Sequence, residues 1–225
     1  MSSVLDKLAE YANRPKHFGN MPHDENGNLG FVVEDAANYP ELRYLYGLIN
    51  RDRFIAGGCF RDIFTDRQDK IRDIDLWHRS KPDWELTLGQ LKFLPDFEEK
   101  YETPNAKGYL HKPTNVTVEA IGRSFGSPED ILKEFDFSIA KFALFMDEFG
   151  QMKVMYHLMY FDHLVEKKLD IHRDYKIEPD GLFNRMVKYI SYGYTPSLSM
   201  KMNLFNAIKN TEDVNISDVK KVNIY

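Results

Sequence analysis

Two short segments decide the fold of this chain: Phe54–Asp62, with the sequence FIAGGCFRD, and Arg72–Trp77, with the sequence RDIDLW. The first reads as an apolar strand, two glycines and the beginning of a helix. Glycine has no Cβ atom, so the backbone can approach a ligand closely, and the amide groups at the start of the helix favour a phosphate. Arg61 lies in the first helical turn, where its guanidinium can hold a phosphate with two hydrogen bonds. Gly57, Gly58 and Arg61 are therefore candidate nucleotide-binding residues.

The second segment alternates polar and apolar residues, which is typical of a strand with one buried face. Asp73 and Asp75 are two residues apart, so a strand projects both carboxylates from the same face. Two neighbouring carboxylates repel each other unless a cation lies between them. Their hard oxygen atoms suit Mg²⁺, with Mn²⁺ as an alternative, and leave positions for phosphates and water. Asp73 and Asp75 are thus predicted metal ligands and catalytic residues for phosphoryl or nucleotidyl transfer.

The order of these features along the chain carries the prediction. A Gly-Gly pair alone is usually a turn, and an Asp-x-Asp pair alone is usually a solvated strand end. Strand, glycine turn, helix and carboxylate-bearing strand in succession favour a joint site for a metal ion and a triphosphate.

The composition limits the other possibilities. The chain has 225 residues, of which 43% are hydrophobic and 14% aromatic, so it can bury a sizeable core. A formal net charge of −5 argues against a protein that coats nucleic acid indiscriminately, although a local basic groove is compatible with it. Cys59 is the single cysteine, which excludes an internal disulfide and a zinc site of several thiolates. No apolar run is long enough to cross a bilayer, so we expect no membrane partner and a cytoplasmic location.

Hydrophobic spacing predicts an α/β head followed by a helical segment. We expect 1–52 to be a partly helical N-terminal extension, 53–157 to be the head, and 158–225 to be a helical neck-like segment and tail. The predicted strands are 54–56, 71–77, 108–111, 116–121 and 152–156. The predicted helices are 3–12, 39–48, 59–66, 84–93, 157–168, 182–192 and 198–209, with a largely helical segment within 130–145.

The two motifs resemble those of the DNA polymerase β-type nucleotidyltransferase superfamily. The resemblance is closest to the head and neck of class II CCA-adding enzymes and bacterial poly(A) polymerases. It rests on Ile55–Gly58, Arg61-Asp62 and Arg72–Asp75, where Arg72 takes the place of a lysine in the family. It implies an α+β fold: a nucleotidyltransferase head, with a mixed sheet and flanking helices, followed by a short helical neck. It also implies an enzyme that moves a nucleoside monophosphate from an NTP to a hydroxyl and releases pyrophosphate.

Later segments extend the resemblance over roughly residues 53 to 195. Val116–Glu119 is similar to the family strand that carries a glutamate, which makes Glu119 a third catalytic carboxylate. Asp136–Ile139 resembles the motif that joins head to neck, and Leu182–Tyr194 resembles the neck helix. The resemblance therefore adds the following candidate nucleotide-binding residues: Arg72, Asp136, Asp180, Arg185 and Lys188.

The sequence departs from the family at two places that bear on specificity. Glu134 and Phe135 stand where the family has two arginines. In the neck, Phe183 stands one helical turn after Asp180, where CCA-adding enzymes have the arginine that helps to read the incoming base. A phenyl ring can only stack or pack, so we expect weak selectivity among NTPs while the transfer chemistry is retained.

Three functions are compatible with these residues. The first is an Mg²⁺-dependent nucleotidyltransferase whose acceptor is the 3′ end of an RNA that resembles tRNA. The second keeps the chemistry but modifies a small molecule, a tRNA or a protein, as antibiotic-modifying enzymes and toxins of the superfamily do. The third is a catalytically idle relative that binds nucleotide or RNA. The intact glycine pair and the Asp73/Asp75 pair favour an active enzyme.

Two groups of residues outside the motifs have more than one interpretation. Tyr189, Tyr192 and Tyr194 could stack on a base or an RNA end, or could belong to the core because they occur at helical spacing. His78 directly follows the strand of the second motif, and we expect it to be a half-exposed residue at the strand end.

Overall fold

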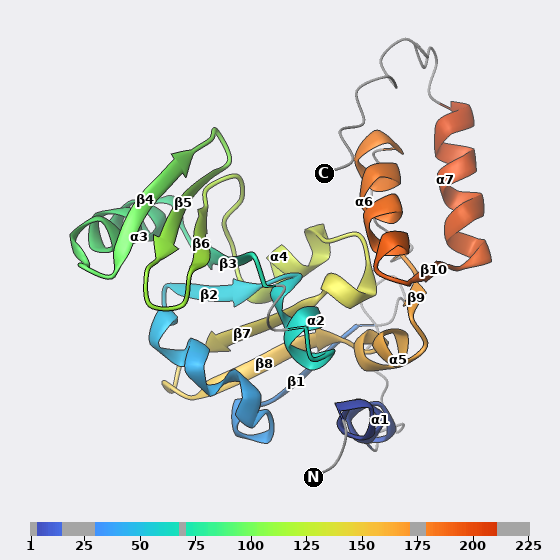
Figure 1. The fold of residues 1–225 in the computed structure, drawn as a ribbon, viewed down its shortest axis with the longest axis horizontal. Helices are drawn as coiled ribbons and strands as arrows, with labels where there is room; N and C mark the ends of the chain where they lie inside the picture. Colours follow the sequence, from blue (N-terminus) through green and yellow to red (C-terminus); the bar gives the residue numbers. More distant parts are fainter. Residues whose placement is uncertain (1–3, 15–29, 68–70, 172–178, 211–225) are drawn as a thin grey trace.

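The computed structural model describes residues 4–14, 30–67, 71–171 and 179–210, and it is built on one large sheet (Figure 1). The order of the eight strands is β1 (Phe31–Asp35), β8 (Met152–His157), β7 (Phe142–Met146), β2 (Arg53–Ala56), β3 (Asp73–His78), β6 (Val116–Ile121), β5 (Ala106–His111) and β4 (Phe97–Glu102). Strands β3 and β6 are parallel, whereas the other neighbours are antiparallel. This mixed sheet with flanking helices confirms the predicted α+β class.

Each face of the sheet has its own hydrophobic core. One core contains Ile55 of β2 with Ile74 and Leu76 of β3, and it is covered by α1 (Val4–Asn13), η2 (Ala36–Asn38), η3 (Pro40–Leu48), α2 (Cys59–Phe64) and α5 (Tyr160–Val165). The other core contains Phe54, Ala56 and Trp77, and α4 (Pro128–Glu134) covers it. Because side chains alternate along a strand, Asp73 and Asp75 share the face of Trp77 and not the face of Ile74. Helix α3 (Lys81–Phe93) packs against β3, β4 and β6.

Strand β7 corrects the prediction of a largely helical segment within 130–145. Only α4 and the short turn η5 (Ser138–Ala140) are helical there, and Phe142–Met146 is a strand between β8 and β2. The run Phe-Ala-Leu-Phe-Met is apolar at every position because both faces of a central strand are covered. Such a run has no period that distinguishes a strand from a helix.

The predicted N-terminal extension contributes to the sheet and to its core. Strand β1 pairs with β8 along its whole length, with Phe31 opposite His157 and Asp35 opposite Lys153. Leu8, Tyr39 and Leu42 are buried in the same core as the strands of the head. The prediction of 1–52 as a partly helical extension did not include this strand.

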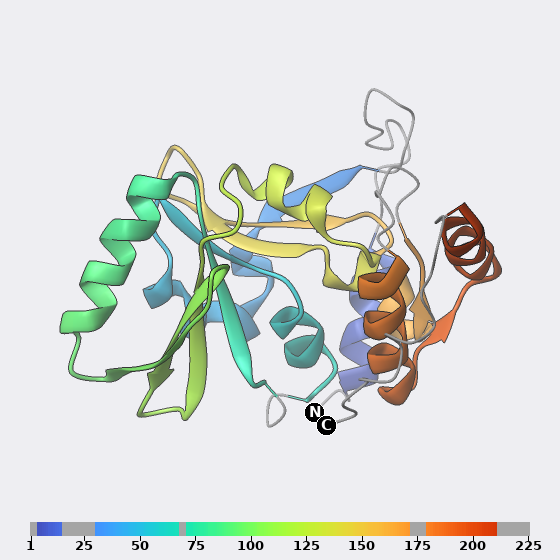
Figure 2. The same cartoon turned by 90° about the horizontal axis from the view of Figure 1, so that it is seen from above.

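The segment after the head is mainly helical, as predicted, and lies at one end of the sheet (Figure 2). It consists of α6 (Pro179–Ser191) and α7 (Leu198–Asn210). Two strands of two residues each, β9 (Lys168–Leu169) and β10 (Thr195–Pro196), pair in parallel between α5 and these helices, which corrects the prediction of helices only. The predicted tail falls outside the described residues from 211 onward.

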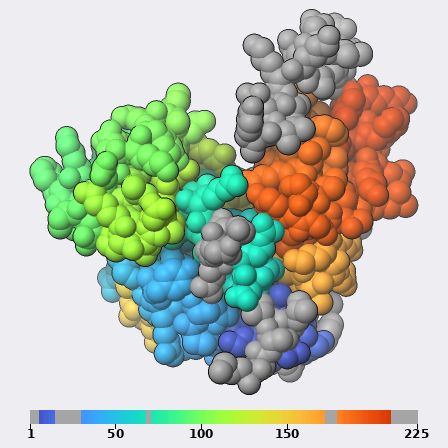
Figure 3. Space-filling view, in the orientation of Figure 1, coloured from blue at the N-terminus to red at the C-terminus, as the bar shows by residue number. Residues whose placement is uncertain are grey.

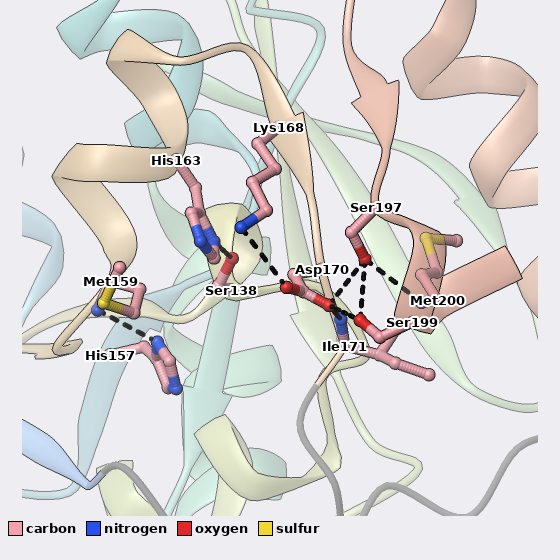
Figure 4. A network of polar contacts seen from close by, with 10 residues as sticks. All are labelled: Ser138, His157, Met159, His163, Lys168, Asp170, Ile171, Ser197, Ser199 and Met200. Carbon is pink, nitrogen blue, oxygen red and sulfur yellow. Dashed lines mark hydrogen bonds and ion pairs between the residues drawn. The ribbon is translucent and has the colours of Figure 1, made fainter. Parts of the chain in front are cut away.

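A network of polar contacts joins the head to this neck (Figure 4). Asp170 accepts hydrogen bonds from the hydroxyls of Ser197 and Ser199, at 2.9 and 3.2 Å, so one carboxylate fixes the start of α7. The amide of Ser138 donates to the carbonyl of Asp170 at 3.2 Å, and the Ser138 hydroxyl lies 2.6 Å from Nδ1 of buried His163. The neck is therefore tied to η5 and α5 of the head. Every described helix falls short of the length and apolar character needed to cross a membrane.

Candidate active site

Three carboxylates lie on the two parallel strands at the centre of the sheet. In the register of β3 and β6, Asp75 is opposite Glu119 and Asp73 is opposite Thr117. Register partners project from the same face, so Asp73, Asp75 and Glu119 share one side of the sheet. Burial first, and then the charges of Asp73 and Glu119, raise the pKa of Asp75 to about 7, against a smaller opposite effect of Arg123 and Lys188. The site thus concentrates negative charge that is unfavourable without a cation.

The glycine turn approaches this charge closely. Gly57 has φ +118°, in the region that favours glycine, and its amide donates to the carbonyl of Phe142 at 3.0 Å. A Cβ atom at this position would lie 3.1 Å from Oδ2 of Asp75 and 3.5 Å from the ring of Phe135. Both the backbone conformation and the space beside Asp75 therefore require glycine.

A cavity of about 660 Å³ opens beside Asp75. In the space-filling view the molecule is hollowed between the β4–β5 hairpin and α6 (Figure 3). The cavity is lined by Gly58, Arg61, Asp62, Asp73, Asp75, Arg123, Lys133, Glu134, Phe135, Asp136, Ala140, Arg185, Lys188 and Tyr189. Its size is in the range of small-molecule sites, and a nucleotide has the matching mixture of apolar base and charged phosphates.

Helix α4 determines where the next cavity residues lie. Ser127 caps the helix by accepting from the amide of Asp130, whose carboxylate accepts in return from the amide of Ser127. At the other end, Phe135 adopts an extended conformation and stops the helix. Buried Lys141 donates to the carbonyl of Leu132 at 3.0 Å, which fixes this end. Phe135 and the residue after it are thereby directed into the cavity.

Arg61 is buried and already has a partner, unlike a guanidinium that is open to a phosphate. It forms two hydrogen bonds with the carboxylate of Asp62, from Nε at 3.2 Å and from Nη2 at 2.7 Å. Its Cζ atom lies 5.0 Å from the ring centre of Tyr189 and 5.4 Å from that of Tyr192. Tyr189 and Tyr194 are buried, which favours the core interpretation of the tyrosines. These contacts hold α6 on the head.

Arg185 is likewise engaged with a carboxylate. It forms an ion pair with Asp136, whose side chain is buried and also accepts from the amide of Phe137 at 2.8 Å. The pair connects the turn before η5 to α6. In the described residues, Arg123 and Lys188 have no ion pair, and both lie close enough to Asp75 to lower its pKa. The Cζ atom of Arg123 also lies 5.2 Å from the ring centre of Trp77.

The structure brings together some of the predicted residues and leaves others aside. Gly58, Arg61, Asp136, Arg185 and Lys188 line the cavity with the two aspartates. Arg72, Asp180, Gly57 and Glu119 are not among its lining residues; Gly57 borders Asp75 from behind, and the exposed side chains of Arg72 and Asp180 lie elsewhere.

Sequence reasoning missed several residues of the site. Arg123 and Lys133 line the cavity without having been predicted as site residues, and Phe135 was noted only as a departure from the family. Tyr189 also lines the cavity; for this residue the sequence left stacking on a base and packing in the core both open. Tyr101 was missed with its strand β4, although its hydroxyl donates to Glu119. The sequence of β4, FEEKYE, has no alternation of polar and apolar residues, so no periodic signal predicted this strand. His78 is fully buried instead of half-exposed, and burial lowers its pKa to about 4.

The donor set fits a divalent cation bound by two carboxylates. No group of three or more carboxylate, histidine or cysteine side chains among the described residues has metal-binding geometry. Mg²⁺ in phosphoryl-transfer sites is commonly held by one or two carboxylates, with substrate phosphates and water completing the octahedron. Asp73 and Asp75, with their accumulated charge beside an open cavity, fit this arrangement, and Glu119 faces Tyr101 instead.

A protein-family model covers this part of the fold. The model, described as Gabija anti-defense 2 family protein, matches residues 31–167, which run from β1 to the end of α5 and make up more than half of the chain. The chain belongs to the Gabija anti-defense 2 family. The matched residues include the glycine turn and the three carboxylates, whereas α6 and α7 follow the match.

Solved structures of CCA-adding enzymes share the fold. The Thermotoga maritima CCA-adding enzyme complexed with tRNA has a TM-score of 0.57 and 14% identity, over 79% of this chain and 46% of the enzyme chain. Complexes of CCA-adding enzyme with ATP and with CTP have TM-scores of 0.58 and 0.56 at the same identity, also over 79% of this chain. The similarity supports a nucleotidyltransferase-like fold, and the chain spans somewhat less than half of these enzymes. Comparison with curated proteins gives no match.

Proposed function

We propose that this chain is a metal-dependent nucleotidyltransferase that moves a nucleoside monophosphate from an NTP to a hydroxyl group and releases pyrophosphate. The observation that supports this most is the position of Asp73 and Asp75. The two carboxylates border a cavity of nucleotide size, and the glycine turn lies against Asp75. The cationic side chains of Arg123 and Lys188 line the same cavity. This arrangement suits charge stabilisation during transfer of a phosphoryl-type group.

The residues of the chain take distinct roles in this proposal. Asp73 and Asp75 would hold Mg²⁺, or Mn²⁺, which when bound supplies positive charge to the reacting phosphate. Arg123 and Lys188 bind the triphosphate, because their charges are not used in described ion pairs. Arg61, through its contact with the ring of Tyr189, and Arg185, through its ion pair with Asp136, position α6 at the cavity. Phe135 offers an aromatic surface to a base or ribose.

The acceptor we propose is the 3′ end of an RNA. The fold is shared with CCA-adding enzymes, one of which was solved as a complex with tRNA. The family match favours a second candidate, because its description concerns activity against a defence named Gabija. In that case the hydroxyl belongs to a component of that defence, and the chemistry is unchanged.

Label transfer separates these candidates. The full chain is incubated with each α-labelled NTP and Mg²⁺, together with total RNA or with the components of the Gabija defence, and products are resolved on denaturing gels. We expect label in RNA, loss of the signal with EDTA, and loss with Asp75→Asn but not with Asp96→Asn, which changes an exposed carboxylate. Label in protein would favour the second candidate. Absence of label and of pyrophosphate with every NTP would contradict the proposal.

A further inference from the structure

Four residues form a row across four neighbouring strands of the sheet. Asp75 on β3 is opposite Glu119 on β6, Glu119 is opposite Gly108 on β5, and Gly108 is opposite Tyr101 on β4. Register partners project from one face. The hydroxyl of Tyr101 passes over Gly108 and donates a hydrogen bond to Oε1 of Glu119. The edge strand of the sheet thus reaches the carboxylate beside Asp75.

Two features of the backbone are needed for this contact. A Cβ atom at position 108 would lie 2.5 Å from Cζ of Tyr101 and 2.6 Å from Cε1, so only glycine leaves room for the ring. The register of β4 and β5 also shifts between Glu99 and Tyr101. Without this irregularity Lys100 would be opposite Gly108, and the Tyr101 side chain would project from the other face. A glycine and a bulge together therefore place one hydroxyl on one carboxylate.

We propose that Tyr101 is a positioning residue for the cation site, in which it holds the Glu119 carboxylate oriented beside Asp73 and Asp75. The inference rests on the proposed function. No group of three carboxylates in the described part of the chain has metal-binding geometry, so Glu119 would contribute a fixed negative charge, and an acceptor for water on the cation, instead of a third direct bond. The affinity of oxygen sites for divalent cations follows the number of charges and the rigidity of the site. Partners that orient such groups typically change metal affinity about 10- to 100-fold when they are removed.

Binding of Mn²⁺ to the full chain without NTP, measured by electron paramagnetic resonance, tests the inference apart from catalysis. Tyr101→Phe keeps the ring over Gly108 and removes only the hydroxyl, so we expect Mn²⁺ affinity to fall by about tenfold. Tyr109→Phe is the matched control, because Tyr109 is on the neighbouring strand β5 and its hydroxyl has no described hydrogen bond. Glu119→Gln should give a similar loss, and the double variant should lose no more than the larger single loss.

The outcomes distinguish this inference from the proposed function. Unchanged Mn²⁺ affinity in folded Tyr101→Phe, or no Mn²⁺ binding by the wild type, overturns the inference. If a urea titration shows that Tyr101→Phe is not folded in buffer, the Glu119→Gln variant decides. It removes the charge of Glu119 and keeps an acceptor for the Tyr101 hydroxyl. Mn²⁺ binding that depends on Tyr101, in a chain that transfers no nucleotide, supports the inference and contradicts the proposed function. Nucleotide transfer by the wild type, together with a Mn²⁺ affinity that is the same in Tyr101→Phe, supports the proposed function and contradicts the inference.

Discussion

Replacing Asp75 with asparagine should stabilise the fold at neutral and alkaline pH. Burial first, and then the charges of Asp73 and Glu119, raise the pKa of Asp75 to about 7, compared with its usual 3.8. Above about pH 4 the unfolded chain releases this proton while the folded chain retains it. The wild type therefore loses stability as the pH rises from about 4 to about 7, and the loss is complete above that. An asparagine carries no charge and avoids the loss.

The size of the effect follows from the difference between the two pKa values. They are about three units apart, and each unit corresponds to about 1.4 kcal/mol, which gives an upper limit of about 4 kcal/mol. The Asp75 side chain is only partly shielded from the cavity, and water there screens the repulsion. We therefore expect Asp75→Asn to increase the free energy of unfolding by about 1 to 4 kcal/mol at about pH 8.

Urea unfolding in the presence of EDTA measures this difference, at about pH 8 and again at about pH 4. The advantage of Asp75→Asn should be small at the lower pH, where the folded carboxyl is protonated and the unfolded one, with a pKa of 3.8, is only partly ionised. Asp96→Asn, at an exposed carboxylate, should show no such dependence. When Mg²⁺ replaces EDTA, the wild type should be stabilised more than the variant, because only the wild type has the full site. A variant that is no more stable than the wild type at about pH 8 would refute the reasoning.

Three further predictions concern the other charges of the cavity. Asp73→Asn should lower nucleotidyl transfer about a hundredfold or more in the labelling assay, since a metal contributes several kcal/mol; retention of activity would remove Asp73 from the site. Arg61→Ala should cost about 3–5 kcal/mol in urea unfolding, because buried Asp62 loses its main partner. A stable variant with weakened NTP binding would instead make Arg61 a phosphate ligand. Lys188→Ala should weaken NTP binding about tenfold in equilibrium titrations, whereas Lys201→Ala on exposed α7 should not; equal affinities would exclude Lys188 as a phosphate contact.

The centre of the fold was predictable from sequence because its signals are local. The strand–glycine–helix order around Gly57 and the alternation around Asp75 depend on a few adjacent residues, and the structure has β2, α2 and β3 at those places. Strand β7 lacks such a signal because its apolar run has no period. Strand β4 contains three glutamates and a lysine among its six residues, so its sequence lacks the alternation of polar and apolar residues that predicts a strand.

The site was less predictable, because its contacts join residues that are distant in sequence. Nothing in the sequence around Arg61 shows whether its guanidinium turns to Asp62 or to a ligand; the packing of Tyr189 over it decides this. The pair of Arg185 and Asp136 spans 49 residues. The contact of Tyr101 with Glu119 depends on a register shift, which no hydrophobic pattern reveals.

The pairing of β1 with β8 has a consequence for synthesis of the chain. The hydroxyl of Tyr156 donates a hydrogen bond to Glu34, 122 residues earlier. Phe31 of β1 likewise pairs with His157 of β8, so β1 cannot pair before β8 has been synthesised. Pairs so distant in sequence form slowly, because closing the loop between them costs entropy before any contact is gained. A nascent chain that has not yet reached β8 therefore carries an unpaired β1, with the free amide and carbonyl groups that another strand can capture. Truncation before Met152 would make this transient state permanent, and aggregation of such fragments would begin at their N-terminal strand.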